Sequence, residues 1–170
     1  MRADERRGPL LAAGILLGIG MGGFFDGILL HQVLQWHHML SAIRPPTDLV
    51  AIKVNMVWDG LFHAFTWVTT MIGLALLWRA GSMRDVPWEA RLLVGSMLLG
   101  WGTFNLVEGL IDHQLLGVHH VHPSASLGWD LAFLASGVAL IAIGWILVRR
   151  RMTHSAGVRA PVRSAAGVKA

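Results

Sequence analysis

The chain has 170 residues, of which 54% are hydrophobic and only 14% are charged, and its formal net charge is +4. A chain this apolar is not an ordinary soluble domain. It contains no cysteine and no tyrosine, which excludes a disulfide framework, a thiolate metal site and a phenolate ligand. It also contains no nucleic-acid-binding motif, so we expect no nucleic-acid partner despite the basic net charge.

Four apolar stretches are long enough to cross a bilayer, which takes about 20 residues each. They cover residues 10–35, 49–78, 92–116 and 127–148. The first follows Arg6 and Arg7, as the core of a signal peptide would, but it is too long for one and we expect it to be retained. The sequence therefore predicts an all-α polytopic membrane protein, a bundle of four transmembrane helices in contact with the lipid bilayer.

The chain divides into a short N-terminal segment (residues 1–9), a membrane domain (residues 10–150) and a basic tail (residues 151–170). The tail is rich in Ala, Gly, Ser and Arg, a composition that predicts disorder. Lys and Arg flank both ends of the membrane domain and its middle loop, whereas the third loop has neither and the first balances Arg44 and Lys53 with Asp48. Because basic residues favour the cytoplasmic side, we expect cytoplasmic termini and outward-facing first and third loops.

One motif occurs twice, with an acid, a Gly, a His-Gln pair and a His-His pair at identical offsets. The first copy consists of Asp26, Gly27, His31, Gln32, His37 and His38, and the second of Glu108, Gly109, His113, Gln114, His119 and His120. The pairs Trp58-Asp59 and Trp129-Asp130 extend the correspondence to the second and fourth stretches. The pattern predicts two parallel helical-hairpin repeats, residues 10–78 and 92–148, related by an axis along the membrane normal.

Acids and histidines at membrane depth are costly and commonly mark a functional site. All four predicted helices carry an acid at a similar depth, and a four-helix bundle can converge such side chains on one core site. The candidate metal ligands are Asp26, His31, His38, Asp59, His63, Glu108, Asp112, His113, His120 and Asp130. Gln32 and Gln114 are candidates for hydrogen bonds to these ligands, and Trp58 and Trp129 for walls of the site.

Helical spacing indicates which of these side chains can meet. Asp59 and His63 are four residues apart and share one helix face. Asp26 and His31 are five residues apart and would diverge on a regular α-helix. Their convergence therefore requires a kink or a bulge, which Gly27 directly after the acid would tolerate.

Five histidines lie near the predicted membrane surface, in the first and third loops: His37, His38, His119, His120 and His122. At the surface they would be solvated or would pass ions inward. Metal binding by His37, His119 and His122 is left open by the sequence.

Imidazole and carboxylate ligands suit Zn, Fe, Mn or Cu(II), whereas the lack of Cys and of a Met cluster near the histidines argues against a dedicated Cu(I) carrier. Buried acids need partners, and no Lys or Arg lies near these acids in the sequence. Protonated His or a metal ion would fill that role. We therefore expect one or two Cu, Fe or Zn ions per chain.

The motifs resemble those of a known family. The run from Asp26 to Gln32, the pair His37-His38 and the run from Asp59 to His63 are similar to those of the bacterial domain of unknown function (DUF) 2243 family of four-helix membrane proteins, over about residues 8–150. The resemblance implies a bacterial inner-membrane location and an association with cytochrome oxidase assembly proteins of the caa3 type. It implies no particular activity.

Three functions are compatible with these observations. The first is a metal-binding membrane protein that handles copper or iron, as a respiratory oxidase assembly factor or as a metal-dependent oxidoreductase. The second is an ion or proton transporter, although the cytoplasmic halves of the predicted helices carry almost no ionisable group. The third is a haem protein with His31 and His113 as axial ligands, against which the neighbouring carboxylates argue. A homo-oligomer is compatible with each.

Overall fold

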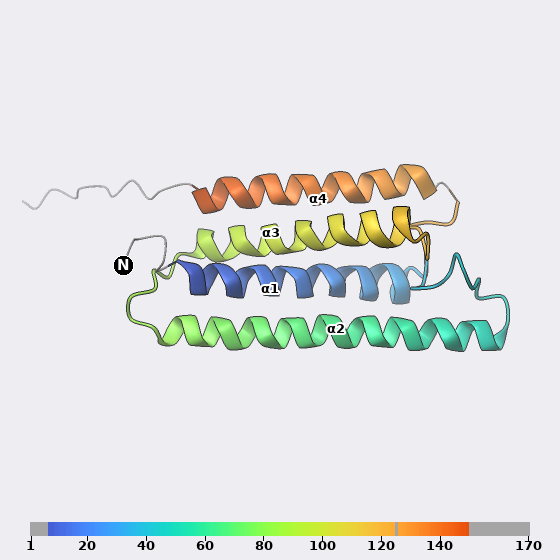
Figure 1. Cartoon of the computed structure of the whole chain (residues 1–170), viewed down its shortest axis with the longest axis horizontal. Helices are drawn as coiled ribbons and strands as arrows, with labels where there is room; N and C mark the ends of the chain where they lie inside the picture. The colour runs from blue at the N-terminus through green and yellow to red at the C-terminus, as the bar shows by residue number, and fades with distance from the viewer. Residues whose placement is uncertain (1–6, 125, 150–170) are drawn as a thin grey trace, which may run out of the picture.

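The computed structural model describes residues 7–124 and 126–149. Four long helices run along one axis: α1 (Gly8–Phe24) continues into η1 (Phe25–Val33), α2 (Leu49–Ser82) follows, α3 (Ala90–Glu108) continues into η2 (Gly109–Leu115), and α4 (Ser126–Arg149) ends the described chain (Figure 1). The described residues contain no strand, so the predicted all-helical fold is confirmed. The tail predicted to be disordered, residues 151–170, lies outside the described residues.

Local sequence signals set the helix ends. Pro9 stands in the first turn of α1, where its missing N–H costs nothing. Asp48 caps α2, because its Oδ1 accepts hydrogen bonds from the backbone N–H groups of Val50 (2.8 Å) and Ala51 (2.9 Å). Leu49 is therefore the first residue of α2, as the sequence predicted, whereas α2 runs past residue 78 to Ser82.

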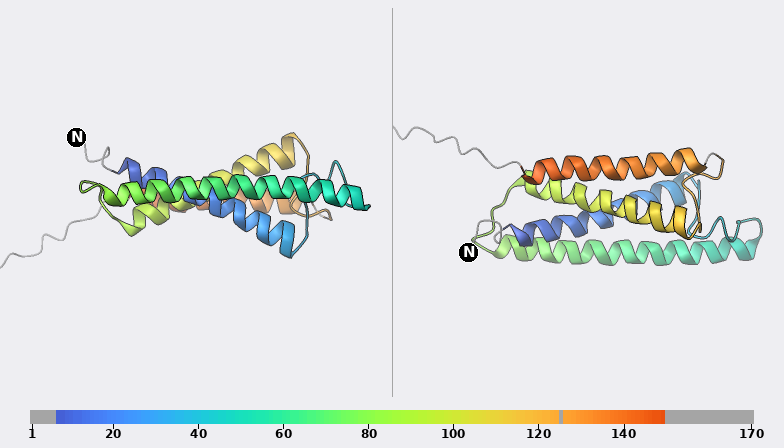
Figure 2. Two further views of the ribbon diagram at one scale, coloured as in Figure 1. Left: turned by 90° about the horizontal axis from the view of Figure 1, so that it is seen from below. Right: turned by 45° about the horizontal axis from the view of Figure 1, so that its top comes forward.

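The helices are arranged in the order α2, α1, α3, α4, so that α1 and α3 form the centre. The helix α1 packs against α2 and α3, and α3 packs against α4, while α2 and α4 do not touch within the described residues (Figure 1). Figure 2 shows α1 and α3 crossing each other at an angle. Gly18 lies against the backbone of Met97, and Gly100 against the backbone of Ile15, because neither glycine has a Cβ to hold the helices apart.

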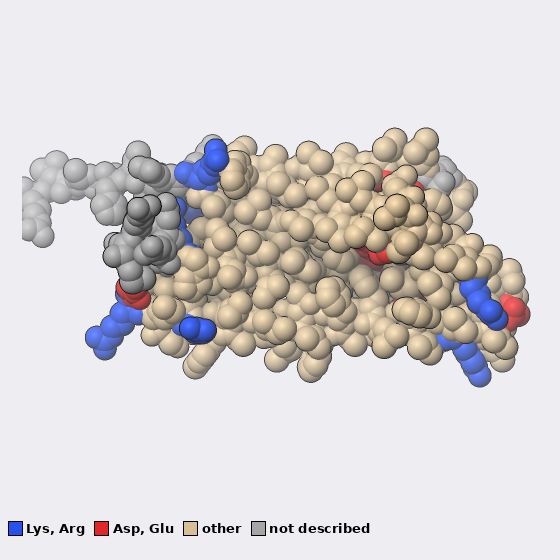
Figure 3. All heavy atoms as spheres, viewed as in Figure 1, with Lys and Arg blue, Asp and Glu red and all other residues tan. Residues whose placement is uncertain are grey.

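All four helices are long and apolar enough to cross a membrane, by length and composition: Gly8–Val33, Leu49–Ser82, Ala90–Leu115 and Leu127–Arg149. Figure 3 shows a broad middle band of the surface without Lys or Arg, which gather towards the two ends of the long axis. One end carries the start of α1, the loop 83–89 and the end of α4. We call the other the histidine end, which is formed by the loops 34–48 and 116–124.

Candidate metal centre

The ends of the two central helices place the first pair of candidate ligands. Near the histidine end, α1 and α3 change from α-helix to the π-helices η1 and η2, whose hydrogen bonds join residues five apart. This brings His31 Nε2 to 3.0 Å from Asp26 Oδ2. The distortion expected after Asp26 is therefore confirmed, and it is what allows an acid and a histidine five residues apart to face one point.

Glycine directly after each acid makes room for the neighbouring helix. A Cβ on Gly27 would lie 2.8 Å from the ring of His63 in α2, and a Cβ on Gly109 would lie 2.8 Å from Leu134 in α4. Both distances are shorter than van der Waals contact. The helices α2 and α4 can thus approach the acids of η1 and α3 from either side of the central pair.

The loops after the two π-helices fold inward. A residue with positive φ turns the chain in each, Gln35 (φ 52°) and Gly117 (φ 59°). His37 and His119 then lie inside the protein, with 3% and 0% of their surface exposed. The expectation that these two histidines lie at the surface is wrong. Periodicity could not show this, because the path of an irregular loop has no period.

Each loop holds its histidine through the loop of the other half. His37 Nδ1 lies 2.9 Å from the carbonyl oxygen of Val121, and His119 Nδ1 lies 3.2 Å from that of Met39. A carbonyl only accepts hydrogen bonds, so Nδ1 carries the proton in both rings and Nε2 keeps its lone pair. Burial lowers the pKa of His37 to about 4 and that of His119 to about 2. Both rings are therefore neutral and able to act as ligands.

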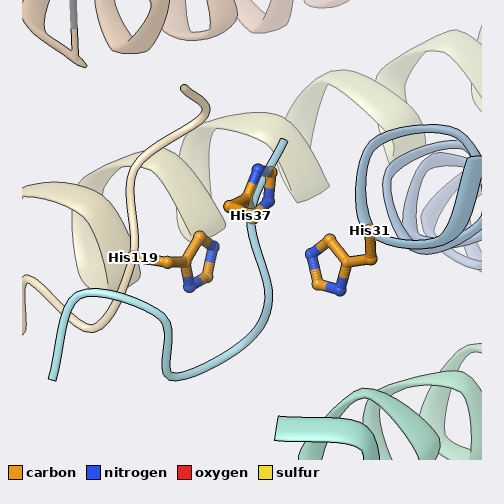
Figure 4. A group of neighbouring side chains, drawn as sticks. All are labelled: His31, His37 and His119. Carbon is orange, nitrogen blue, oxygen red and sulfur yellow. The ribbon is translucent and has the colours of Figure 1, made fainter. Parts of the chain in front are cut away.

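Six buried side chains meet between the four helices, and we call them the core cluster: Asp26, His31, His37, Glu108, His113 and His119. The ring centroids of His31 and His37 are 4.5 Å apart, those of His37 and His119 are 4.7 Å apart, and those of His113 and His119 are 4.8 Å apart. Figure 4 shows His31 reaching from η1 towards His37 and His119 on the two inward loops.

Overlapping groups of three from the core cluster meet the distance requirement for metal ligation. The nearest ligand atoms lie within 4.8 Å of one another in the groups His31–His37–His119, Glu108–His113–His119 and Asp26–His31–Glu108. The third group also shows that the two acids of the cluster face each other. Carboxylates this close repel each other unless a proton or a cation lies between them.

The core cluster presents polar atoms that no protein group satisfies. Within residues 7–124 and 126–149, both carboxylate oxygens of Glu108 and Nε2 of His37, His113 and His119 are buried without a hydrogen-bond partner, and the Asp26 carboxylate has only the nearby Nε2 of His31. Burial of unpaired polar atoms is costly, and native proteins keep few of them. Atoms of these types, gathered in one place, are those that a transition metal prefers.

Asp59 orients one side of the cluster from α2. Its carboxylate accepts hydrogen bonds from Nδ1 of His38 (2.7 Å), Nδ1 of His31 (3.2 Å) and the backbone N–H of Met39 (2.9 Å). Gln32 Nε2 donates a longer one (3.4 Å). A carboxylate on Nδ1 fixes the tautomer of an imidazole and directs Nε2 towards a ligand. In this position Asp59 acts on the cluster through His31.

Asp130 repeats this arrangement from α4. Its carboxylate accepts hydrogen bonds from Nδ1 of His120 (2.7 Å), the backbone N–H of Val121 (3.0 Å) and Nε2 of Gln114 (3.3 Å). Nδ1 of His113 lies 3.3 Å from its other oxygen. Each of these four contacts of Asp130 thus has a counterpart among the contacts of Asp59.

Four of the predicted residues lie away from the core cluster. His63 donates from Nδ1 to the carbonyl of Asp59 (2.7 Å) and packs beside Gly27. Asp112 is half-buried on the outer side of Glu108, where both line an apolar cleft. The two tryptophans lie further out.

Trp58 and Trp129 face outward, with 47% and 43% of their surface exposed. The Trp129 ring packs against that of Trp36, with centroids 5.0 Å apart, and the His122 ring lies beside both, 5.1 Å from Trp36 and 6.3 Å from Trp129. These contacts place His122 outside the core cluster, in a small aromatic group at the histidine end.

The predicted ligands Asp26, His31, Glu108 and His113 thus come together, with His37 and His119 completing the set. Sequence reasoning chose the second member of each His-His pair, whereas the structure directs the first one inward. The signal available was the exact recurrence of the whole pair, which marks both members but does not distinguish them.

The fold and the core cluster together define a class of protein: a small four-helix membrane protein with histidines and carboxylates buried between its helices. The chain belongs to the family described as "Predicted membrane protein (DUF2243)", which matches residues 13–151. This confirms the family resemblance found in the motifs. No curated protein and no solved structure matches the chain.

Proposed function

We propose that this protein is an integral membrane metal-binding protein whose core cluster holds one or two transition-metal ions. One observation carries the proposal: four imidazole nitrogens and two carboxylates are buried together, and within the described residues their closest mutual polar contact is the 3.0 Å approach of His31 Nε2 to Asp26 Oδ2. A metal ion would satisfy all of these atoms and would offset the repulsion between Asp26 and Glu108. Asp59 and Asp130 would keep the imidazoles of His31 and His113 in the ligating orientation.

The donor set favours iron, zinc or Cu(II), because it combines imidazole with carboxylate and contains no sulfur. A redox-active ion would supply one-electron chemistry in a site closed to water. The proposed role is therefore the handling of copper or iron, either in the assembly of a respiratory oxidase or as a metal-dependent oxidoreductase. The assembly role draws its support from the family resemblance and the oxidoreductase role from the donor set.

The proposal includes the placement of the protein. We place the histidine end on the outer side of a bacterial inner membrane and both termini in the cytoplasm. The support is the distribution of basic residues, since Arg79, Arg84 and Arg91 lie in or next to the loop at the opposite end and the third loop has no Lys or Arg. Metal would then enter from the outer side.

Two features argue against the other functions. A transporter needs a path through the bundle, but away from the histidine end the backbones of α1 and α3 are in contact at Gly18 and Gly100. A haem between His31 and His113 needs a wide apolar slot. That space is occupied by His37, whose ring lies 4.5 Å from His31 and 6.3 Å from His113.

Metal analysis of the purified, full-length protein tests the proposal directly. We expect one or two ions per chain by mass spectrometry of the elements, and loss of at least half of the bound metal in His31→Ala and in His119→Ala. The matched control is His122→Ala, which lies outside the core cluster and should retain the metal. Substoichiometric metal that neither cluster variant changes would contradict the proposal.

A further inference from the structure

A cleft of about 350 Å³ opens on one side of the bundle, between α1, α2 and α3. Its walls include the side chains of Ile19, Phe62 and Phe104, and its polar end is formed by Glu108 and Asp112. All of these residues belong to segments long and apolar enough to cross the membrane, so the cleft opens towards lipid rather than water.

The cleft leads to the core cluster. Glu108 belongs to both, is only 4% exposed, and has no hydrogen-bond partner for either carboxylate oxygen among the residues that the structure describes. Phe62 also connects the cleft with the core cluster, because its ring lines the cleft and stacks on the ring of His31 with centroids 5.6 Å apart. Asp112 at the mouth is half-buried, and its carboxylate forms no hydrogen bond or ion pair within residues 7–124 and 126–149.

The two halves of the chain differ at this place. The residues equivalent to Ile19 and Val107 of the cleft are Trp101 and Phe25, whose rings pack together with centroids 5.4 Å apart. Large rings therefore fill the space in one half that smaller side chains leave open in the other.

The acid at the mouth also has no counterpart. The residue equivalent to Asp112 is Leu30, which is buried. At these equivalent positions, one half carries packed aromatic rings and a buried Leu, and the other carries smaller side chains and an acid. An acid facing lipid is costly unless it serves a ligand.

We propose that the cleft binds the hydroquinone head of a membrane-dissolved quinol, whose hydroxyl groups donate hydrogen bonds to Glu108 and Asp112. The aromatic walls suit a flat ring, and carboxyl oxygens accept hydrogen bonds from hydroxyl groups. Two acids repel the phosphate of a lipid headgroup, so charge argues against an anionic phospholipid. The inference rests on the proposed function in one respect, since it places the head beside a metal ligand.

Binding of a decyl-tailed benzoquinol to the purified protein in phosphatidylcholine nanodiscs tests the inference. Empty nanodiscs correct for partition of the probe into lipid. We expect saturable binding of about one quinol per chain. Ile19→Trp should abolish it by filling the cleft, and Asp112→Asn should weaken it roughly tenfold through loss of a charge-assisted hydrogen bond. The matched control, Ile28→Trp on the exposed side of η1, should bind as the wild type does.

Three results would overturn the inference: no binding above that of empty nanodiscs, binding unchanged in both Ile19→Trp and Asp112→Asn, or displacement of the quinol by phosphatidylethanolamine, which would make a lipid amine the occupant. Metal content measured on the same samples separates this inference from the proposed function. A protein that retains metal but binds no quinol contradicts only the inference, whereas a protein without metal contradicts the proposed function whether or not it binds quinol.

Discussion

At the scale of single residues, the protonation of His37 and His119 is set by what surrounds them. Each ring donates one proton to a carbonyl of the opposite loop and is otherwise enclosed. The nearby acid Asp26 favours the charged form of His37, but burial outweighs it. A histidine that stays neutral in the folded protein at a pH where the unfolded chain is protonated makes the free energy of unfolding depend on pH.

The metal-free protein should lose stability as the pH falls below about 6.5. In the unfolded chain both histidines take up protons near that pH, whereas in the folded protein the pKa of His37 is about 4 and that of His119 about 2. The unfolded state then binds more protons, so the free energy of unfolding should fall by about 1.4 kcal/mol per pH unit for each ring between pH 6.5 and the folded-state pKa.

Thermal unfolding of the metal-free protein in detergent at pH 7.5 and pH 5.5 measures this effect. The melting temperature should be lower at pH 5.5, and His37→Gln should reduce the difference. His122→Gln serves as the control, because within the described part of the chain that ring hydrogen-bonds only to Ser124, at the surface of the histidine end. An equal pH dependence in the wild type and in His37→Gln would refute the assignment of a neutral His37.

At the scale of elements, the contact between α1 and α3 determines how η1 and η2, which continue these helices, lie relative to each other at the histidine end. The crossing depends on glycines whose missing side chains let one backbone touch the other. A methyl group at such a contact pushes the helices apart, because the opposing atom belongs to rigid backbone.

Gly18→Ala should destabilise the protein by about 1–3 kcal/mol, since its Cβ would collide with the carbonyl group of Met97. The control is Gly60→Ala in α2, where nothing lies within 4 Å of the added methyl group and stability should be unchanged or slightly higher. Thermal unfolding in one detergent gives the comparison. Equal melting temperatures for the two variants would mean that the helices do not depend on this contact.

Sequence reasoning was successful for the elements and partly successful for the site. Hydropathy located all four helices because each span must be apolar over its whole length. The pair Asp26 and His31 was accessible from spacing once Gly27 suggested a distortion. The inward turn at Gln35 was not accessible, because it depends on the hydrogen bond between His37 and the distant Val121.

At the scale of the whole molecule, most of the described basic residues and the core cluster lie towards different ends, with Arg44 and Lys53 the exceptions at the histidine end (Figure 3). Because the chain has no cysteine, single cysteines can report on each side. Thr47→Cys in the loop 34–48 should react with a membrane-impermeant maleimide in intact cells, and Asp85→Cys in the loop 83–89 only after lysis; both positions are exposed. The reverse pattern of labelling would contradict the proposed orientation and would place metal entry in the cytoplasm.

The exchange of hydrogen bonds between the two inward loops also bears on how such a chain could have arisen. Because each half holds the other's histidine, a single half could complete its ligand set only by pairing with a second copy of itself. Gene duplication followed by fusion of a symmetric dimer would produce the present arrangement. Fusion releases the copies from having to remain identical, and one of them could then exchange Trp and Phe for Ile and Val while the shared ligands stayed in place.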